Sequence, residues 1–567
     1  MGIVEAVEET ALAAHETYVA DNPTQPLHHF SSDASALWPK IDHLLYQPVL
    51  GLTRPRDLYY YQGQGLEGLY GFTYKYLTLE HFLGQLTRVR AGTPLAEVLA
   101  MTYARAWYPG REPLILFADW HVKPHWTQVY SHAGHVTMWG RTMPGTKQLI
   151  LNGFGGRLLG GWDYPIDTHM THVLGHLEEA WEQVLQRPIL CTVLDGEGGG
   201  LPLGDRYATL ERHYLSVLSG EHAHCLAEFV REGRWQPVKD DPSREAVFAR
   251  WADPQQATRD PRRFVLMRPV GHLEPTRIYT GRFPENLNAG EIPWLHRRRW
   301  PYNELRIRDL IQGANLNVNY GYTYTEVPNR TRQRAWEAAQ DQVEVTERQL
   351  SNHQTALRNL RRRLTDLQEA HAAQRRELEH QVLQQRLDLQ HRQRLGQATT
   401  RSQQRIDRLR RELTSLTERF QRRQGSLRYQ LQQHQTQAGE LQARLAQRLT
   451  MRDAIDTETL CRERETEKDQ MMLNWQILLA NLHDWAAQTY FAPPWRTLSL
   501  EKATQMIYRK PGRVTWHKDR IEVMLEPYRY PSQQRDMEVT CARFNAANLR
   551  WRDGRSLHIS VAPSGKF

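Results

Sequence analysis

The sequence predicts a mixed α/β core that carries a long coiled-coil hairpin. Two short apolar stretches, Pro113–His121 (PLILFADWH) and Ile189–Asp195 (ILCTVLD), each predict a buried strand with an aspartate at its end. Alternation of such strands with helical patterns predicts a mixed sheet flanked by helices. A later stretch has almost no proline and leucines seven residues apart, which predicts the coiled coil. A helical N-terminal region and a small C-terminal α/β domain complete the expected fold.

Length and composition limit the class of protein. At 567 residues the chain is too long for one hydrophobic core, so several domains are expected. The net charge of +9 favours a polyanionic partner, usually nucleic acid, although the surface could simply be basic. The cysteines form no C-x-x-C pair, which fits a reducing cytoplasm. We find no signal-peptide pattern and no apolar run of about 18 residues, so no membrane span is expected.

Residues 1–110 are expected to be helical. Gly2–Asp21, Leu77–Val89 and Pro94–Trp107 all have helical spacing of apolar residues. Aromatic and basic residues interleave between them, so the region either binds DNA or forms a helical cap on the next domain. It has no clear helix-turn-helix pattern.

Residues 111–330 form the expected α/β core. The predicted strands after the first are Val136–Trp139, Gln148–Asn152, Arg157–Trp162, Ile189–Asp195, Phe264–Met267 and Arg277–Tyr279. The predicted helices are Thr168–Gln186, a helix around Asp205–Leu218, and the latter part of Trp294–Ile311.

Residues 331–470 form the predicted coiled coil. Leu350, Leu357 and Leu364 are seven residues apart, and Ile406–Phe420 repeats the 3-4 spacing. The heptad lapses at Leu395–Thr400, near the middle, which favours an antiparallel helical hairpin. One continuous helix in a parallel dimer is the alternative. We expect the coiled coil to act as a dimerisation or DNA-end-bridging arm, and the protein to form a homodimer through it.

Residues 471–567 are expected to hold helices and a small α/β domain. Met471–Tyr490 predicts an apolar helix that ends at a Pro-Pro pair. Arg513–His517 and Arg520–Leu525 predict a β-hairpin. Met537–Asn548 predicts a helix and Ser556–Val561 a last strand.

Candidate catalytic acids follow the two core strands. A bare carboxylate is too costly to bury, so Asp119 and Asp195 must be solvated, paired or bound to a cation. A third acid, Glu304, lies beside Asn303 near the start of a predicted helix. Three such acids form the site of the RNase H-like nucleotidyl transferases, where two divalent cations clamp an in-line phosphoryl displacement. Mg²⁺ takes hard oxygen ligands, which explains carboxylates in these positions.

An ordered set of motifs resembles one branch of the bacterial DDE-type insertion-sequence transposases. The motifs are Asp119-Trp120-His121, Asp195-Gly196-Glu197-Gly198, Arg299-Trp300-Pro301-Tyr302-Asn303-Glu304 and Tyr320…Val327-Pro328-Asn329. The resemblance spans about Pro113 to Asn329 and is weaker in the coiled coil and in Gly512–Val561. It implies an RNase H-like core, Mg²⁺ or Mn²⁺, and cleavage and joining of double-stranded DNA at the ends of a mobile element. The expected location is the cytoplasm, associated with the nucleoid.

The third acid departs from the family pattern. When Arg299-Trp300 is aligned on the family's pair, the catalytic acid falls on Asn303, and Glu304 stands where the family has asparagine. One residue along a helix is a rotation of about 100°, so both cannot face the metal ions equally. We expect a shift of helix register that brings Glu304 to Asp119 and Asp195. Alternatively, Asn303 is a weaker ligand or the site is degraded.

Other residues are secondary candidates. Glu197, His121 and Arg299 lie within the motifs, and His121 or Lys123 could touch the scissile phosphate. The rival functions are a nuclease without strand transfer and a catalytically degraded or domesticated transposase that acts as a DNA-binding coiled-coil scaffold. Gly140…Gly145-Thr146-Lys147 has phosphate-loop spacing but lacks the required Lys-Ser/Thr order, so we expect a turn. His169, His172 and His176 share a helical face, but no carboxylate or thiol clearly completes a zinc site.

Overall fold

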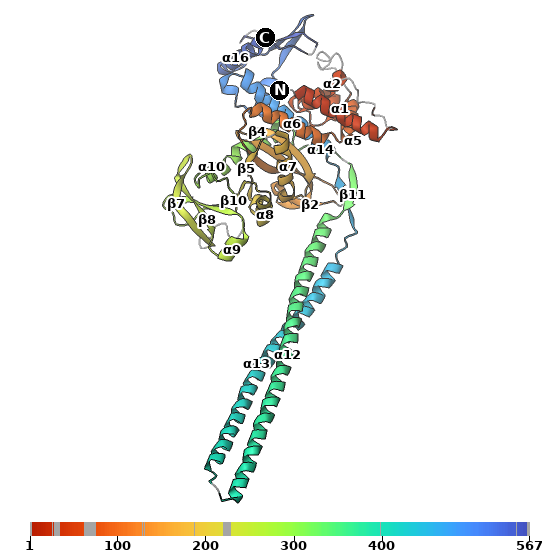
Figure 1. Ribbon diagram of the computed structural model, residues 1–567. Coiled ribbons are helices and arrows are strands. Elements are labelled where there is room, and N and C mark those ends of the chain that lie inside the picture. The colour runs from red at the N-terminus through yellow and green to blue at the C-terminus, as the bar shows by residue number, and fades with distance from the viewer. Residues whose placement is uncertain are drawn as a thin grey trace. The chain divides into compact units, whose positions relative to one another are not determined.

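The computed structural model describes residues 3–24, 27, 34–61, 75–127, 129, 131–185, 187–218, 228–321, 323–396, 398–551 and 553–563. The chain forms two compact units (Figure 1). Unit 1 combines residues 1–325 with 462–567, and unit 2 is Glu326–Cys461. Three of the segments expected from the sequence, 1–110, 111–330 and 471–567, therefore fall almost wholly within unit 1. Among the described residues, no helix is long and apolar enough to cross a membrane.

A large mixed sheet forms the centre of unit 1 (Figure 1). Its order is β2-β3-β1-β5-β6-β10-β9-β8-β7, with β4 also paired to β3. The pairs β1–β5 and β5–β6 are parallel and the others are antiparallel. The strands are β1 (Leu114–Pro124), β2 (Ala133–Val136), β3 (Arg141–Gly153), β4 (Arg157–Pro165), β5 (Ile189–Val193), β6 (Tyr214–Val217), β7 (Phe229–Val238), β8 (Asp241–Trp251), β9 (Arg263–Pro269) and β10 (Arg277–Arg282).

Three parts of this sheet differ from the sequence prediction. The strand expected at Val136–Trp139 is wrong beyond Val136, because β2 ends there and Thr137–Trp139 form a 3-10 helix. The helix expected around Asp205–Leu218 is correct only for its first part, because α8 (Leu201–Thr209) ends and β6 follows. β6 is an inner strand whose Tyr214, Leu215 and Ser216 are all buried, and such a strand lacks the alternation that marks a half-exposed one. The strands β7 and β8 were not predicted at all, and β7 is mostly exposed and polar.

Helices cover the sheet and link its strands. Those of the core are η2 (Thr137–Trp139), α7 (Met170–Leu185), η3 (Gly196–Gly199), α8, α9 (Pro254–Arg259), α10 (Glu291–Arg297), the π-helix η6 (Trp300–Glu304) and α11 (Leu305–Gly313). The N-terminal helices are α1 (Ile3–Asp21), α2 (Ala34–Leu45), α3 (Gln47–Leu50), η1 (Pro55–Tyr61), α5 (Tyr76–Arg88) and α6 (Gly92–Trp107). They share one hydrophobic core with the sheet.

Helix α14 (Glu467–Tyr490) is the central helix of that core. It packs against α5, α6 and β4, and most of its residues are buried on every side. Its buried polar side chains find partners inside the core: Gln470, Asn474 and Asn481 donate to the backbone carbonyls of Gly161, Gly92 and Leu158. Gly161 in β4 permits the close contact, because a Cβ there would lie 2.9 Å from side-chain atoms of Leu473 and Ile477.

The C-terminal segment adds a second, three-stranded sheet to unit 1. Its order is β13-β14-β15, and β14 and β15 are parallel. Its elements are η7 (Pro493–Trp495), α15 (Leu500–Ala503), the π-helix η8 (Thr504–Tyr508), β13 (Gly512–Trp516), β14 (Arg520–Leu525), α16 (Pro531–Ala546) and β15 (Ser556–Val561). The predicted hairpin at Arg513–Leu525 corresponds to β13 and β14.

Unit 2 is a hairpin of two long helices, α12 (Arg330–Arg394) and α13 (Thr400–Asp453), shown in Figure 1. The turn follows Arg394, where the heptad lapses, and Gly396 adopts a φ of +67° there. The buried positions Val343, Thr346 and Leu350 follow the 3-4 spacing. The strands β11 (Tyr324–Pro328) and β12 (Leu460–Arg464), which pair with each other, flank the two helices in the chain.

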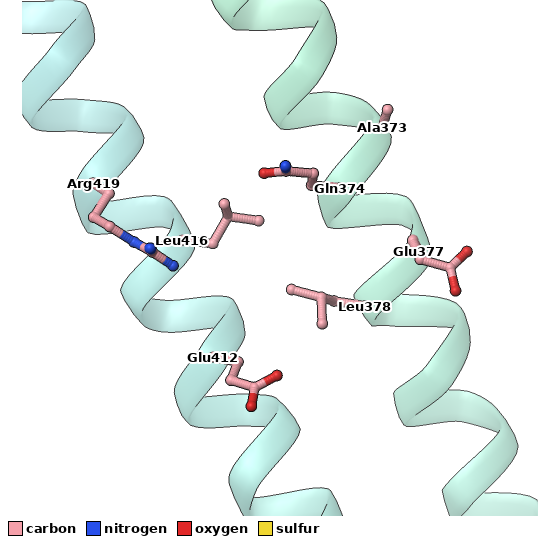
Figure 2. Close-up of a pocket in the computed structure, with 7 residues that line it drawn as sticks. All are labelled: Ala373, Gln374, Glu377, Leu378, Glu412, Leu416 and Arg419. Carbon is pink, nitrogen blue, oxygen red and sulfur yellow. The ribbon is translucent and has the colours of Figure 1, made fainter.

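The seam of the hairpin has an open groove of about 560 Å³ between α12 and α13 (Figure 2). Leu378 and Leu416 point toward each other across it. Gln374 also points into the seam, four residues before Leu378, and Ala373 lines the same groove. A polar side chain therefore occupies a position that the heptad reserves for an apolar one.

Candidate active site

The two strand aspartates are brought together by parallel pairing of β1 and β5. Phe117 of β1 pairs with Val193 of β5. Asp119 lies two residues after Phe117, and Asp195 lies two residues after Val193. Side chains two residues apart on a strand lie on the same face, so both aspartates project to the face of Phe117 and Val193. That face packs against Ile292 of α10, in a hydrophobic cluster shared with the strands.

The third segment runs from α10 through η6 into α11. At the π-turn the Leu305 amide donates to the Trp300 carbonyl, five residues back. Pro301 favours this widening, because it has no N–H to donate to the carbonyl of Arg297. In a π-turn, residues five apart lie nearly above one another. Arg299 and Glu304 therefore both face the sheet, although regular α-helical geometry would separate them.

All three acids converge on the guanidinium group of Arg299. Its Nη1 donates to Asp119 Oδ2 at 2.7 Å, and its Nη2 lies 3.2 Å from Asp195 Oδ1. The same Nη2 pairs with Glu304 Oε1. Arg299 is 12% exposed at its side chain, whereas Asp195 is 54% exposed, so the site opens to solvent on the Asp195 side. One positive charge thus faces three carboxylates.

Asp119 has the most perturbed carboxyl group of the three. Burial raises its pKa to about 7, and the neighbouring Asp195 and Glu304 raise it further. The guanidinium of Arg299 and the Trp120 amide, which donates to Oδ1 at 2.9 Å, both oppose that shift of the pKa. Burial is therefore the main cause of the raised pKa, and the charge of Arg299 offsets it only in part.

Asn303 is not part of this convergence. Its side chain is completely buried, and neither amide atom has a hydrogen-bond partner among the described residues. A buried unpaired amide costs about 1–3 kcal/mol, and this segment tolerates that cost. The structure therefore brings Glu304, rather than Asn303, to the two aspartates.

The secondary candidates lie elsewhere. Glu197 in η3 pairs with His169 at 3.7 Å and not with Arg299. His121 is 5% exposed, and burial lowers its pKa to about 4. Lys123 is 1% exposed and donates to Asp469 of α14 at 2.8 Å. His121 and Lys123 are thus internal residues, and neither is exposed to a DNA phosphate.

The two other sequence motifs have structural roles. Thr146 and Lys147 lie within β3, where Lys147 pairs opposite Val122 of β1, so this segment is a strand and not a phosphate loop. The histidines of the His169–His176 face do not converge on one point, and the ring centroids of His169 and His172 are 6.4 Å apart. His176 Nε2 lies 3.0 Å from Arg206 Nη2, and His169 pairs with Glu197.

The donor set at Arg299 suits a hard divalent cation. Asp119, Asp195 and Glu304 offer only oxygen atoms, which Mg²⁺ and Mn²⁺ prefer. Three ionised carboxylates around one guanidinium carry a net negative charge, which favours a cation of higher charge. The residues present therefore fit the expected metal ion, provided that Arg299 withdraws.

A different group of metal-type ligands was missed by sequence analysis. His132, Asp167 and Glu463 have ligand atoms that all lie within 4.8 Å of one another. These residues are far apart in the sequence and share no motif, so only the fold could reveal them.

Comparisons with known proteins give no relative for this chain. No protein-family model matches it. No curated protein is significantly similar to it. The function must therefore be argued from the site itself.

Proposed function

We propose that this chain is a DDE-type DNA transposase that cleaves and joins strands at the ends of a mobile element. The observation that carries the proposal is the convergence of Asp119, Asp195 and Glu304 on one guanidinium. An acid on the central strand β1, a second after the parallel neighbour β5 and a third on a following helix are what an RNase H-like core requires. The sequence motifs at the same residues support this assignment.

The proposal assigns metal binding to the three acids and phosphate binding to Arg299. Asp119, Asp195 and Glu304 hold Mg²⁺ or Mn²⁺, which supplies activation of the attacking oxygen and stabilisation of the leaving one. Arg299 leaves the carboxylates and binds the DNA phosphate, since a guanidinium matches phosphate oxygens in a bidentate manner. Asp195, the most exposed of the three, lies where DNA would enter.

The net charge and the helical hairpin indicate which partners the proposed transposase would have. A net charge of +9 favours double-stranded DNA at the element ends and at the target. The helical hairpin of unit 2 provides a dimerisation surface, and transposition requires two ends to be held together. The location that follows is the cytoplasm, in association with the nucleoid.

Calorimetric titration of Mn²⁺ tests the metal site. We expect the wild type and Asn303→Ala to bind the ion and Glu304→Ala to lose at least tenfold in affinity. Glu197→Ala is the matched control, because this nearby acid pairs with His169 and should leave Mn²⁺ binding unchanged. Loss in Asn303→Ala with retention in Glu304→Ala would reverse the assignment of the third acid.

An assay with two DNA molecules separates the proposal from a nuclease. We expect both nicks at the element end and joined products, each dependent on Mn²⁺ and on Asp119. Nicks without joined products would indicate a nuclease with the same core.

A degraded transposase is the second candidate, and Arg299 favours it. The guanidinium already neutralises part of the acid cluster, so the core is stable without an ion. Absence of Mn²⁺ binding by the wild type, together with retained DNA binding, would establish a DNA-binding scaffold in place of an enzyme.

A further inference from the structure

A second group of ligands lies in unit 1 on elements that do not form the acid site. His132 precedes β2, Asp167 lies between β4 and α7, and Glu463 is in β12. Their ligand atoms lie within 4.8 Å of one another, and His132 Nδ1 is 3.8 Å from Glu463 Oε1. Ligands of a tetrahedral ion at about 2.1 Å are about 3.4 Å apart, so small side-chain rotations would close this group on an ion.

The backbone around the group is held independently of any ion. Val136, Met143 and Ile166 form a small buried apolar cluster beside it. Gly134 allows the contact, because a Cβ there would lie 2.8 Å from Ile166 Cγ1. The segments that carry His132 and Asp167 are therefore fixed against each other by packing, which preorganises two of the ligands.

A cavity of about 20 Å³ adjoins these ligands. His132 and Glu463 line it, and so does His125, which is 6% exposed. Nε2 of His125 is buried without a hydrogen-bond partner among the described residues. The cavity has room for about one water-sized particle. His125 is not in the group whose ligand atoms lie within 4.8 Å of one another, so it borders the candidate site and is not one of its direct ligands.

The local charges permit a cation. Asp167 and Glu463 supply two carboxylates, and the side chain of Glu463 is only 21% exposed. Arg462 also lines the cavity, so the two carboxylates are accompanied by one arginine there. Arg464 is a second lining arginine, and its guanidinium is paired with Asp469 at 3.0 Å. Its positive charge is thereby compensated by a buried carboxylate.

We propose that His132, Asp167 and Glu463 hold a Zn²⁺ ion, with the remaining coordination position taken by a water molecule. Imidazole and carboxylate together suit zinc, whereas Mg²⁺ takes oxygen ligands and retains several waters for which this cavity is too small. The site ties the strand β12, where the chain re-enters unit 1, to the connections around β2 and β4. It is independent of the acid site and of the proposed transposase activity.

Metal titration of the full chain, stripped of metal with a chelator, tests the site. We expect one equivalent of Zn²⁺ to bind, and Co²⁺ to bind with the visible absorption of a tetrahedral complex containing a nitrogen ligand. His132→Gln and Glu463→Gln should each lose at least tenfold in Zn²⁺ affinity. His135→Gln is the matched control, because this exposed histidine lies three residues from His132 and outside the ligand group.

The same titration in Asp119→Asn separates this site from the acid site. Binding of Zn²⁺ should persist there, because Asp119 contributes nothing to the proposed zinc ligands. Zn²⁺ should also raise the melting temperature of the wild type but not that of His132→Gln. The proposal is overturned if the wild type binds no stoichiometric Zn²⁺, or if His132→Gln binds it as tightly as the wild type does.

Discussion

Arg299 is the residue on which the candidate site depends. Three carboxylates surround its guanidinium. Burial, with a smaller contribution from Asp195 and Glu304, raises the pKa of Asp119 to about 7 against the opposing charge of Arg299. Any ion that binds here must compete with a side chain already in contact with all three acids. Arg299 therefore acts as an internal counterion, and its replacement separates competition for the acids from contact with DNA.

Arg299→Ala should bind Mn²⁺ about tenfold more tightly, a difference of about 1.4 kcal/mol, because the competing cation is removed. The same variant should lose DNA cleavage, because the proposed phosphate contact is lost as well. Calorimetry and a nicking assay measure the two effects. Arg298→Ala is the control, since Arg298 pairs with Asp240 at 3.0 Å and should change neither. Weaker Mn²⁺ binding by Arg299→Ala would contradict the counterion role.

Glu178 in α7 predicts a dependence of stability on pH. Burial raises its pKa from 4.5 to about 7, even though Thr192 and Tyr207 donate hydrogen bonds to its Oε1. An acid with a raised pKa binds more protons in the folded chain. The free energy of unfolding therefore falls as pH rises from about 4.5 to about 7. This shift corresponds to about 3 kcal/mol at most.

Glu178→Gln should remove that part of the pH dependence, because the amide oxygen still accepts both hydrogen bonds and carries no charge. Urea unfolding at pH 5 and pH 8 measures the effect. We expect the variant to match the wild type at pH 5 and to exceed it at pH 8. Glu179→Gln, one residue along and exposed, should follow the wild type at both. Equal stabilities of wild type and Glu178→Gln at pH 8 would count against the raised pKa.

At the scale of elements, the π-turn of η6 determines which side chain reaches the two aspartates. Pro301 cannot donate to Arg297, and Leu305 donates to Trp300 instead. Pro301→Ala restores an N–H, so the segment can return to regular α-helix and rotate Glu304 away from the sheet. We expect Mn²⁺ affinity to fall several-fold while the melting temperature stays close to that of the wild type. Unchanged affinity would show that packing, and not Pro301, holds the turn.

The hairpin seam offers a test of the coiled-coil packing. Gln374 points into the groove near Leu378 and Leu416 (Figure 2). Gln374→Leu should stabilise the hairpin by about 1 kcal/mol, because the leucine side chain is removed from water when it packs into the seam. Ala372→Leu adds apolar surface at an exposed position that does not line the groove, and it should give no such gain. Thermal unfolding of the full chain, followed by circular dichroism at the helical band, compares the two.

At the scale of the whole molecule, sequence reasoning succeeded where the signal is local. Asp119 and Asp195 follow apolar runs that can only be core strands, and parallel pairing places their side chains together. The helical hairpin follows from leucine spacing and a lapse in the heptad. The π-turn at Pro301 is a register change within one helix, which periodicity does not specify. The sequence therefore led us to expect a shift of helix register toward Glu304, but it did not predict the π-turn that produces this shift.

Long-range contacts set the limit of what the sequence could predict. Lys123 looked like a candidate for contacting phosphate, but it pairs with Asp469, which lies beyond the entire helical hairpin in the chain. His132 and Glu463 are separated in the same way. Helix α14 likewise follows the hairpin, yet it forms the centre of the main core. A long insertion thus separates in sequence the residues that unit 1 brings together.

The two-unit division predicts that unit 2 can be removed. Thr323 Oγ1 donates to Glu465 Oε2 at 2.8 Å, and the Glu465 amide donates to the Thr323 carbonyl at 3.0 Å. The chain therefore leaves and re-enters unit 1 at adjacent points. A Gly-Ser linker of about six residues can replace Glu326–Cys461, since such a linker spans roughly 13 Å on average.

This deletion variant should keep the acid site and lose the dimer. Asp119, Asp195, Arg299 and Glu304 all lie in unit 1, so Mn²⁺ binding should stay within about twofold of the full chain. Light scattering after size exclusion should give a dimer for the full chain and a monomer for the variant. Nicking of a single DNA end should persist, and joining that needs two ends should be lost. A dimeric deletion variant would place the dimer interface in unit 1, and a full chain that stays monomeric with DNA would remove the hairpin's assigned role.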